Sequence, residues 1–138
     1  MTVLRQLREE SHLSPEQLAA TAGLNLAWYY DLETHEDELT SNVSLGSIAR
    51  LARALGVKPS ALYGGQSTAT ISLDHLASLV REHVARSGKS LEDFETATGW
   101  SVADALANPE EFRKFNVDGL RATAEAVNVD WYYVLDGL

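Results

Sequence analysis

The sequence LSPEQLAATAGLN, residues 13–25, decides the fold. Ser14 places a hydroxyl at a helix N-cap, Pro15 follows where no amide donor is missed, and Gln17 can bond back to the cap, which makes a capping box. Gly23 supplies the left-handed backbone that ends a helix, and Asn25 caps the next one. The stretch therefore predicts a helix over residues 15–22, a tight turn, and a second helix that runs to about residue 34.

The pattern continues on the C-terminal side of this motif. Residues 35–43 are polar and predict a loop. Ser44 caps the next predicted helix, whose apolar residues recur on one face, and Gly56 ends it. Pro59 then opens a short last helix. Together with a helix in the amphipathic stretch at the start of the chain, the first 65 residues therefore predict five helices.

A second copy of the pattern begins after a Gly-Gly-Gln-Ser-Thr run at residues 64–68. Ser14 and Gly23 align with Ser90 and Gly99 at a shift of 76 positions, whereas the helix beginning near residue 45 aligns with residues further on at a shift of 72. Two blocks in register that differ by one short deletion are typical of a duplicated module with a variable loop. We expect two tandem five-helix domains in an all-α chain, at residues 1–65 and 72–138, joined by a linker at residues 66–71.

Composition sets the broad class of the protein. The chain has 138 residues, of which 45% are hydrophobic, which is sufficient for a compact core. It begins without the long apolar run of a signal peptide or membrane span. It has no cysteine, which excludes disulfides and thiolate metal sites. These features favour a cytoplasmic protein that does not enter the membrane.

The first copy, residues 4–65, resembles the phage-repressor family of helix-turn-helix domains, the Xre/Cro type. The second copy, residues 80–137, resembles it only through its alignment with the first. The residues that carry the resemblance are Leu4-Arg5-Gln6-Leu7-Arg8, Leu13-Ser14-Pro15-Glu16-Gln17-Leu18-Ala19, Ala22-Gly23-Leu24, Tyr29, Leu32-Glu33, Ser44-Leu45, Ile48, Leu51-Ala52 and Leu55-Gly56-Val57.

The resemblance implies roles for several residues. Arg8 and Glu33 occupy the positions where the family places a structural ion pair between its first and third helices, and we interpret them as scaffold. Val84 and Pro109 stand at these positions in the second copy. Losing both partners together avoids leaving one charge buried and unpaired.

The resemblance also implies that the exposed face of the third helix enters the major groove of DNA. Asn25 is the one good bidentate base reader on this face, and Leu26, Ala27 and Trp28 offer apolar contacts. Two arginines on the next helix stand three residues apart and form either a phosphate-facing patch or ordinary solvated surface. The predicted DNA-binding residues are Gln17, Asn25, Leu26, Ala27, Trp28, Tyr30, Arg50 and Arg53.

Net charge weighs against strong DNA binding. Formal charge is −9 overall, with −3 up to Ser67 and −6 beyond it. Nonspecific affinity for DNA comes mostly from Lys and Arg that displace counterions at phosphates. The segment after the third helix, His35-Glu36-Asp37-Glu38, adds carboxylates where the family often has basic residues. We interpret it as a solvated acidic loop and not as a metal site.

The second copy has no base reader, because its third helix would carry only Ser101, Val102, Ala103, Asp104, Ala105 and Leu106. We expect it to pack or dimerise instead of binding DNA. Operators of this family are commonly palindromic, so one reader per chain implies a homodimer with the second copy as its interface.

Two function classes follow. The first is a sequence-specific DNA-binding transcriptional regulator. The alternative is an acidic interaction module that has lost DNA binding and docks a protein partner through Leu26, Trp28 and Tyr30. An equally weighted interpretation of Trp28 is that its side chain packs against the other copy. We do not expect an enzyme or a cofactor, because the four histidines are scattered and no glycine-rich phosphate loop is present.

Overall fold

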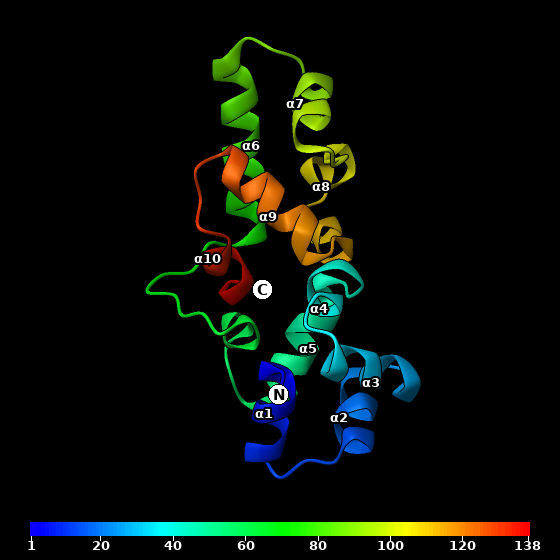
Figure 1. Cartoon of the computed structure of the whole chain (residues 1–138). Helices are drawn as coiled ribbons and strands as arrows, with labels where there is room; N and C mark the ends of the chain where they lie inside the picture. The colour runs from blue at the N-terminus through cyan, green and yellow to red at the C-terminus, as the bar shows by residue number, and fades with distance from the viewer.

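The computed structural model describes all residues, 1–138, and contains only helices (Figure 1). The elements of the first half are α1 (Val3–Glu10), α2 (Pro15–Ala22), α3 (Leu26–Thr34), α4 (Glu38–Ser41), α5 (Leu45–Leu55) and the 3-10 helix η1 (Pro59–Tyr63). Those of the second half are α6 (Leu73–Ser87), α7 (Leu91–Thr98), α8 (Ala103–Ala107), the 3-10 helix η2 (Pro109–Lys114), α9 (Val117–Ala126) and α10 (Trp131–Asp136). The all-α prediction is confirmed.

The predicted start and end signals of the helices in the helix-turn-helix motif are confirmed. Ser14 caps α2, and the Gln17 side chain bonds back to it, so the capping box is complete. Gly23 adopts φ 70° at the end of α2, a left-handed backbone that favours glycine. Asn25 is the N-cap of α3. The two helices therefore begin and end where short-range backbone chemistry requires.

The prediction of a loop over residues 35–43 was wrong, because a short helix, α4, forms within it. Asp37 occupies the N-cap position but its side chain makes no cap hydrogen bond. Leu39 is buried, and packing against the core stabilises the turn. The first half consequently has six elements, and the last of them is a 3-10 helix and not an α-helix.

The second half follows the same order of elements. Ser90 and Asp93 form a capping box at the start of α7, and Gly99 ends this helix with φ 78°. Ser72 caps α6 and Asp130 caps α10. The helices α7, α9 and α10 begin where the shifts found in the sequence place them, whereas α6 has 15 residues against 8 in α1. Duplication is an interpretation of the sequence.

One hydrophobic core runs through both halves. Its 27 buried residues come from the first and second halves alike, from Leu4 to Leu135. Across the junction, α4 packs on α9, α5 on η2, and η1 on α10. The Tyr63 ring meets the edge of Trp131 at a centroid distance of 5.6 Å, and burial raises the pKa of the Tyr63 hydroxyl. The two halves are therefore docked against each other.

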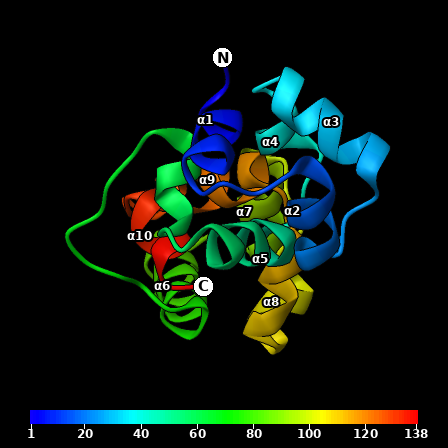
Figure 2. The ribbon, with the colours of Figure 1, turned by 90° about the horizontal axis from the view of Figure 1, so that it is seen from below.

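The segment between the halves is tethered. It has no helix between Gly64 and Ser72. The Ser67 hydroxyl donates to the carboxylate of Asp136, and the Ile71 amide donates to the Tyr133 carbonyl at 2.9 Å. These bonds hold the segment against α10. Seen from below, it still forms the outermost loop of the molecule (Figure 2).

None of the helices combines the length and the apolar character that a membrane span requires.

Candidate nucleic-acid interface

The helix α3 is held on the body of the first half by its buried face. Tyr29 and Leu32 are fully buried there, and Glu33 is nearly so. The helix packs on α1, α2 and α4, whereas the second half packs on α4, α5 and η1. The outer face of α3 is therefore left uncovered by the second half, at the edge of the molecule in Figure 1.

The expected ion pair between Arg8 and Glu33 forms and anchors α3 to α1. The Arg8 guanidinium donates to Glu33 through Nε and Nη2, and to the Leu13 carbonyl at 2.9 Å. The Tyr29 hydroxyl donates to Glu33 Oε1 at 2.5 Å. The hydrogen bond to Glu33 raises the pKa of Arg8, and burial raises the pKa of Tyr29. This network fixes the orientation of α3 and confirms that Arg8 and Glu33 belong to the scaffold.

Exposed aromatic and acidic side chains dominate the outer face of α3. Trp28 is 37% exposed and Tyr30 44%, and they are the only exposed aromatic residues of the chain. Ala27, Asp31 and Thr34 are exposed beside them. Because the Trp28 side chain remains exposed, packing against the second half does not explain why a tryptophan occurs at this position. No lysine or arginine occurs on this helix.

Asn25 has a structural task that limits base reading. Its Oδ1 accepts hydrogen bonds from the amides of Ala27 at 2.9 Å and Trp28 at 3.3 Å. Bidentate recognition of adenine needs both the carbonyl and the amino group of the side chain. Only the amino group remains free, so Asn25 can donate to a base but cannot accept from it while the cap stays intact.

Gln17 and Leu26, which were also predicted as DNA contacts, are engaged in the fold as well. The Gln17 Oε1 accepts from the Ser14 amide at 2.8 Å, which leaves its amino group to donate. Leu26 is half-buried and packs against the core. The members of the predicted set on α3 that are exposed are therefore Ala27, Trp28 and Tyr30.

Arg50 and Arg53 are both exposed on α5, as the predicted stripe requires. Arg50 Nη2 donates to the Ser47 hydroxyl at 3.2 Å, and neither arginine has a carboxylate partner. Lys58 is the other cation of the first half without such a partner. These side chains are the ones available to phosphates.

The surface around the motif is acidic. No lysine or arginine occurs between Arg8 and Arg50, whereas eight Asp and Glu residues do. Glu33 and Glu9 are paired with Arg8 and Arg5. Glu16, Asp31, Glu36 and Asp37 are exposed without a cation partner. No group of three metal-ligating side chains is clustered in the structure.

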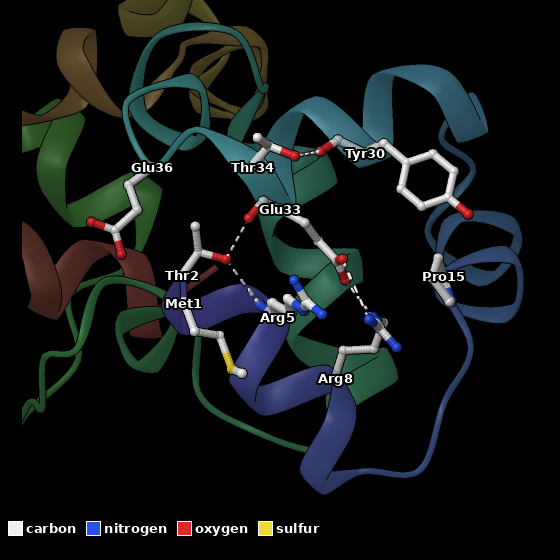
Figure 3. A pocket seen from close by; sticks show the side chains of 9 residues that line it. All are labelled: Met1, Thr2, Arg5, Arg8, Pro15, Tyr30, Glu33, Thr34 and Glu36. Atoms are coloured by element: carbon white, nitrogen blue, oxygen red, sulfur yellow. Dashed lines mark hydrogen bonds and ion pairs between the residues drawn. The ribbon is translucent and has the colours of Figure 1, made fainter.

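A hollow of about 740 Å³ lies beside the outer face of α3, between the starts of α1 and α2 (Figure 3). The Arg8–Glu33 pair forms its floor, and Met1, Pro15 and Tyr30 border it. The Tyr30 hydroxyl donates to Glu16 Oε1 at 3.4 Å. The sequence reasoning missed the contact of Glu16 with Tyr30, because these two residues lie on different helices and meet only in the folded chain.

Comparison with known proteins bears on the first half. A family model described as a helix-turn-helix domain matches residues 2–63. The match supports a helix-turn-helix domain of the Xre/Cro-like kind over residues 2–63. No curated protein and no solved structure matches the chain. The helix-turn-helix match supports a DNA-binding regulator at the general level, and domains of this family are typically not enzymes.

The second half contributes no cation to the helix that matches α3 in order. The exposed residues at α8 include Ser101, Ala103, Asp104 and Ala107. Glu95 accepts from the amides of Val102 at 2.6 Å and Ala103 at 3.3 Å and so caps α8, and these bonds lower the pKa of Glu95. None of these exposed side chains is a lysine, arginine, asparagine or glutamine.

Proposed function

We propose that the protein is a DNA-binding transcriptional regulator that contacts DNA with α3 of the helix-turn-helix domain. The observation that carries the proposal is the α2–Gly23–α3 unit, which projects α3 at an edge that the second half leaves free. Arg50 and Arg53 supply phosphate contacts, with single donors from Asn25 and Gln17 and apolar contacts from Ala27, Trp28 and Tyr30. The second half packs on the first and does not read bases.

The proposed contacts imply modest affinity with a shallow salt dependence. Each phosphate contact contributes about 0.9 to the slope of log affinity against log salt. Two or three cations, Arg50, Arg53 and Lys58, give a slope of roughly −2 to −3. Most of the discrimination between sequences then comes from apolar contacts and DNA shape.

The experiment is selection of genomic DNA fragments by the purified full chain at low salt. The enriched fragments are then titrated with protein and followed by fluorescence anisotropy. Arg53→Gln is expected to reduce the salt slope by about 1 and to weaken all sites alike. Lys89→Gln removes an exposed, unpaired cation of the second half and serves as the matched control. No sequence enrichment, or equal losses in the two variants, contradicts the proposal.

A second function is favoured by the charge distribution. An α3 surface with two exposed aromatics, four unpaired carboxylates nearby and no cation suits a basic segment of a protein better than a polyanion. Trp28 and Tyr30 supply rigid anchors and cation–π faces, and Glu16 and Asp31 supply opposite charge. In this alternative the domain serves as a protein-interaction module.

Paired substitutions separate the two functions. In the interaction module, Trp28→Ala abolishes binding of a Lys/Arg-rich peptide, and Asp31→Asn weakens it. In the DNA reader, Asp31→Asn strengthens binding of duplex DNA because one repulsive charge is gone. The opposite response of the same variant to the two ligands identifies the class of partner.

A further inference from the structure

The contacts between the two halves are reciprocal. In the order of elements, α9 corresponds to α5, η2 to α4, and α10 to η1. The packing of α4 on α9 is therefore the counterpart of the packing of α5 on η2, and η1 packs on its own counterpart, α10. This is the pattern of an isologous interface, in which the same patch on two subunits pairs with itself across a two-fold axis.

The starts of α5 and α9 meet at the centre of this interface. Ser44 caps α5 and Asn116, its counterpart at the shift of 72, caps α9. Asn116 Nδ2 donates to the Ser41 carbonyl at 2.9 Å, and the Leu45 amide donates to the Phe115 carbonyl at 2.8 Å. Equivalent ends of equivalent helices therefore face each other, as a two-fold axis requires.

The arrangement of the remaining helices agrees with such an axis. In Figure 1, α1 and α2 lie below the junction, and α6 and α7 lie above it. In Figure 2, α1 and α3 lie in the upper part of the view and α6 and α8 in the lower part. In both views α3 and α8 lie toward the same side, which is the arrangement that a half-turn about a horizontal line produces.

We infer that the second half takes the place of the second subunit of a two-fold dimer, so that the protein acts as a monomer. The pairing surface formed by α4, α5 and η1 is occupied by α9, η2 and α10 of the same chain. This surface is then closed to a second chain, and this arrangement departs from the homodimer through the second half that the sequence led us to expect.

The arrangement has a consequence for recognition that rests on the proposed DNA-binding function. One chain presents α3 and an altered α8 on one side, and only α3 carries contacts suited to a base. A particle with one reader recognises a single half-site. The DNA fragments enriched in a binding selection should therefore contain one unrepeated motif in place of an inverted repeat. Each duplex should bind one protein chain.

The geometry offers a direct test of pairing within one chain. A Cβ atom at Gly46 would lie 3.8 Å from Cβ of Arg113, the mean separation in disulfides, and the chain has no other cysteine. The double variant Gly46→Cys, Arg113→Cys is oxidised at several protein concentrations and run on a nonreducing gel beside the two single variants. Light scattering of the unmodified chain during gel filtration gives its mass.

We expect the double variant to oxidise to a band of monomer size at every concentration, with no cross-link in either single variant. The unmodified chain should scatter as a 15.1 kDa particle. A cross-linked dimer, or a dimeric mass at micromolar concentration, overturns the inference. If the cross-linked protein does not form, the mass measurement on the unmodified chain still decides. Neither readout depends on DNA, so a failed DNA-binding function would be recognised separately.

Discussion

Asp136, near the C-terminus, holds the start of η1 in the first half through Ser60. Its carboxylate accepts from the Ser60 amide at 2.8 Å and from the Ser60 hydroxyl at 2.7 Å. Lys58, the N-cap residue of η1, provides no side-chain cap. The cap of a helix in the first half is therefore supplied by the last helix of the second half. This contact couples the stability of the two halves.

Asp136→Asn should destabilise the whole chain because it weakens hydrogen bonds to a charged acceptor. The expected loss is about 1.5–3 kcal/mol of unfolding free energy. Urea unfolding followed by circular dichroism measures it. Asp104→Asn, at an exposed aspartate on α8, should change stability by less than about 0.5 kcal/mol. Equal effects of the two substitutions would show that the link through Ser60 contributes nothing.

Substitutions of Asn25 separate its role as the α3 cap from a role in base recognition. Asn25→Ala should cost about 1 kcal/mol of stability through loss of the α3 cap, whereas Asn25→Ser should cost little because serine caps equally well. If the free amino group reads a base, both variants lose the same discrimination at one position of the DNA site. Thermal unfolding and anisotropy measure the two effects. Discrimination that survives in Asn25→Ser would exclude the amino group as a reader.

The Arg8–Glu33 pair predicts strong coupling between α1 and α3. Glu33→Gln should cost about 3 kcal/mol because it leaves the Arg8 guanidinium, 11% exposed, without its counter-ion. Arg8→Met combined with Glu33→Leu should cost less than the sum of the two single changes, since no unpaired charge remains. A double-mutant cycle from urea unfolding gives the coupling, and additive losses would contradict it.

Glu95 should make the stability of the second half depend on pH. Its pKa is lowered in the folded protein because its carboxylate accepts from the Val102 amide. This contribution is therefore complete above the unfolded value of about 4.3 and is lost as pH falls through the lower folded value. Glu95→Gln should be less stable near neutral pH and should lose less stability on acidification.

The measurement is unfolding free energy from pH 3 to 7 for the two proteins. Glu92→Gln, on the exposed side of the same helix, is the control and should follow the unmodified curve. Parallel curves for Glu95→Gln and the unmodified protein would mean that the cap at α8 does not depend on the charge of Glu95.

Much of the fold was predictable, because its signals are local. The capping box at Ser14, the left-handed Gly23 and the cap at Asn25 depend on atoms within a few residues of each other, so sequence spacing is sufficient. The short helix α4 was missed because Leu39, and not a capping side chain, stabilises it. Burial of that kind depends on residues distant in the sequence.

The candidate site was predictable only in part. The sequence placed Trp28 and Tyr30 on α3 and Arg50 and Arg53 on α5, and all four are exposed. It also suggested Asn25 as both a cap and a base reader. The structure shows that the side-chain carbonyl oxygen of Asn25 is used by the helix cap. Only the amino group of this side chain is left to contact a base.

The sequence by itself determined the ends of the capped helices, the helix-turn-helix motif and the acidic character of its surface, since each depends on residue type and short spacing. Only the tertiary structure decided that the halves dock through reciprocal contacts, that Asp136 caps η1, and that α3 stays outside the junction. These features depend on side chains that are as many as 76 positions apart. Their contact depends on how the two halves pack, which no local pattern encodes.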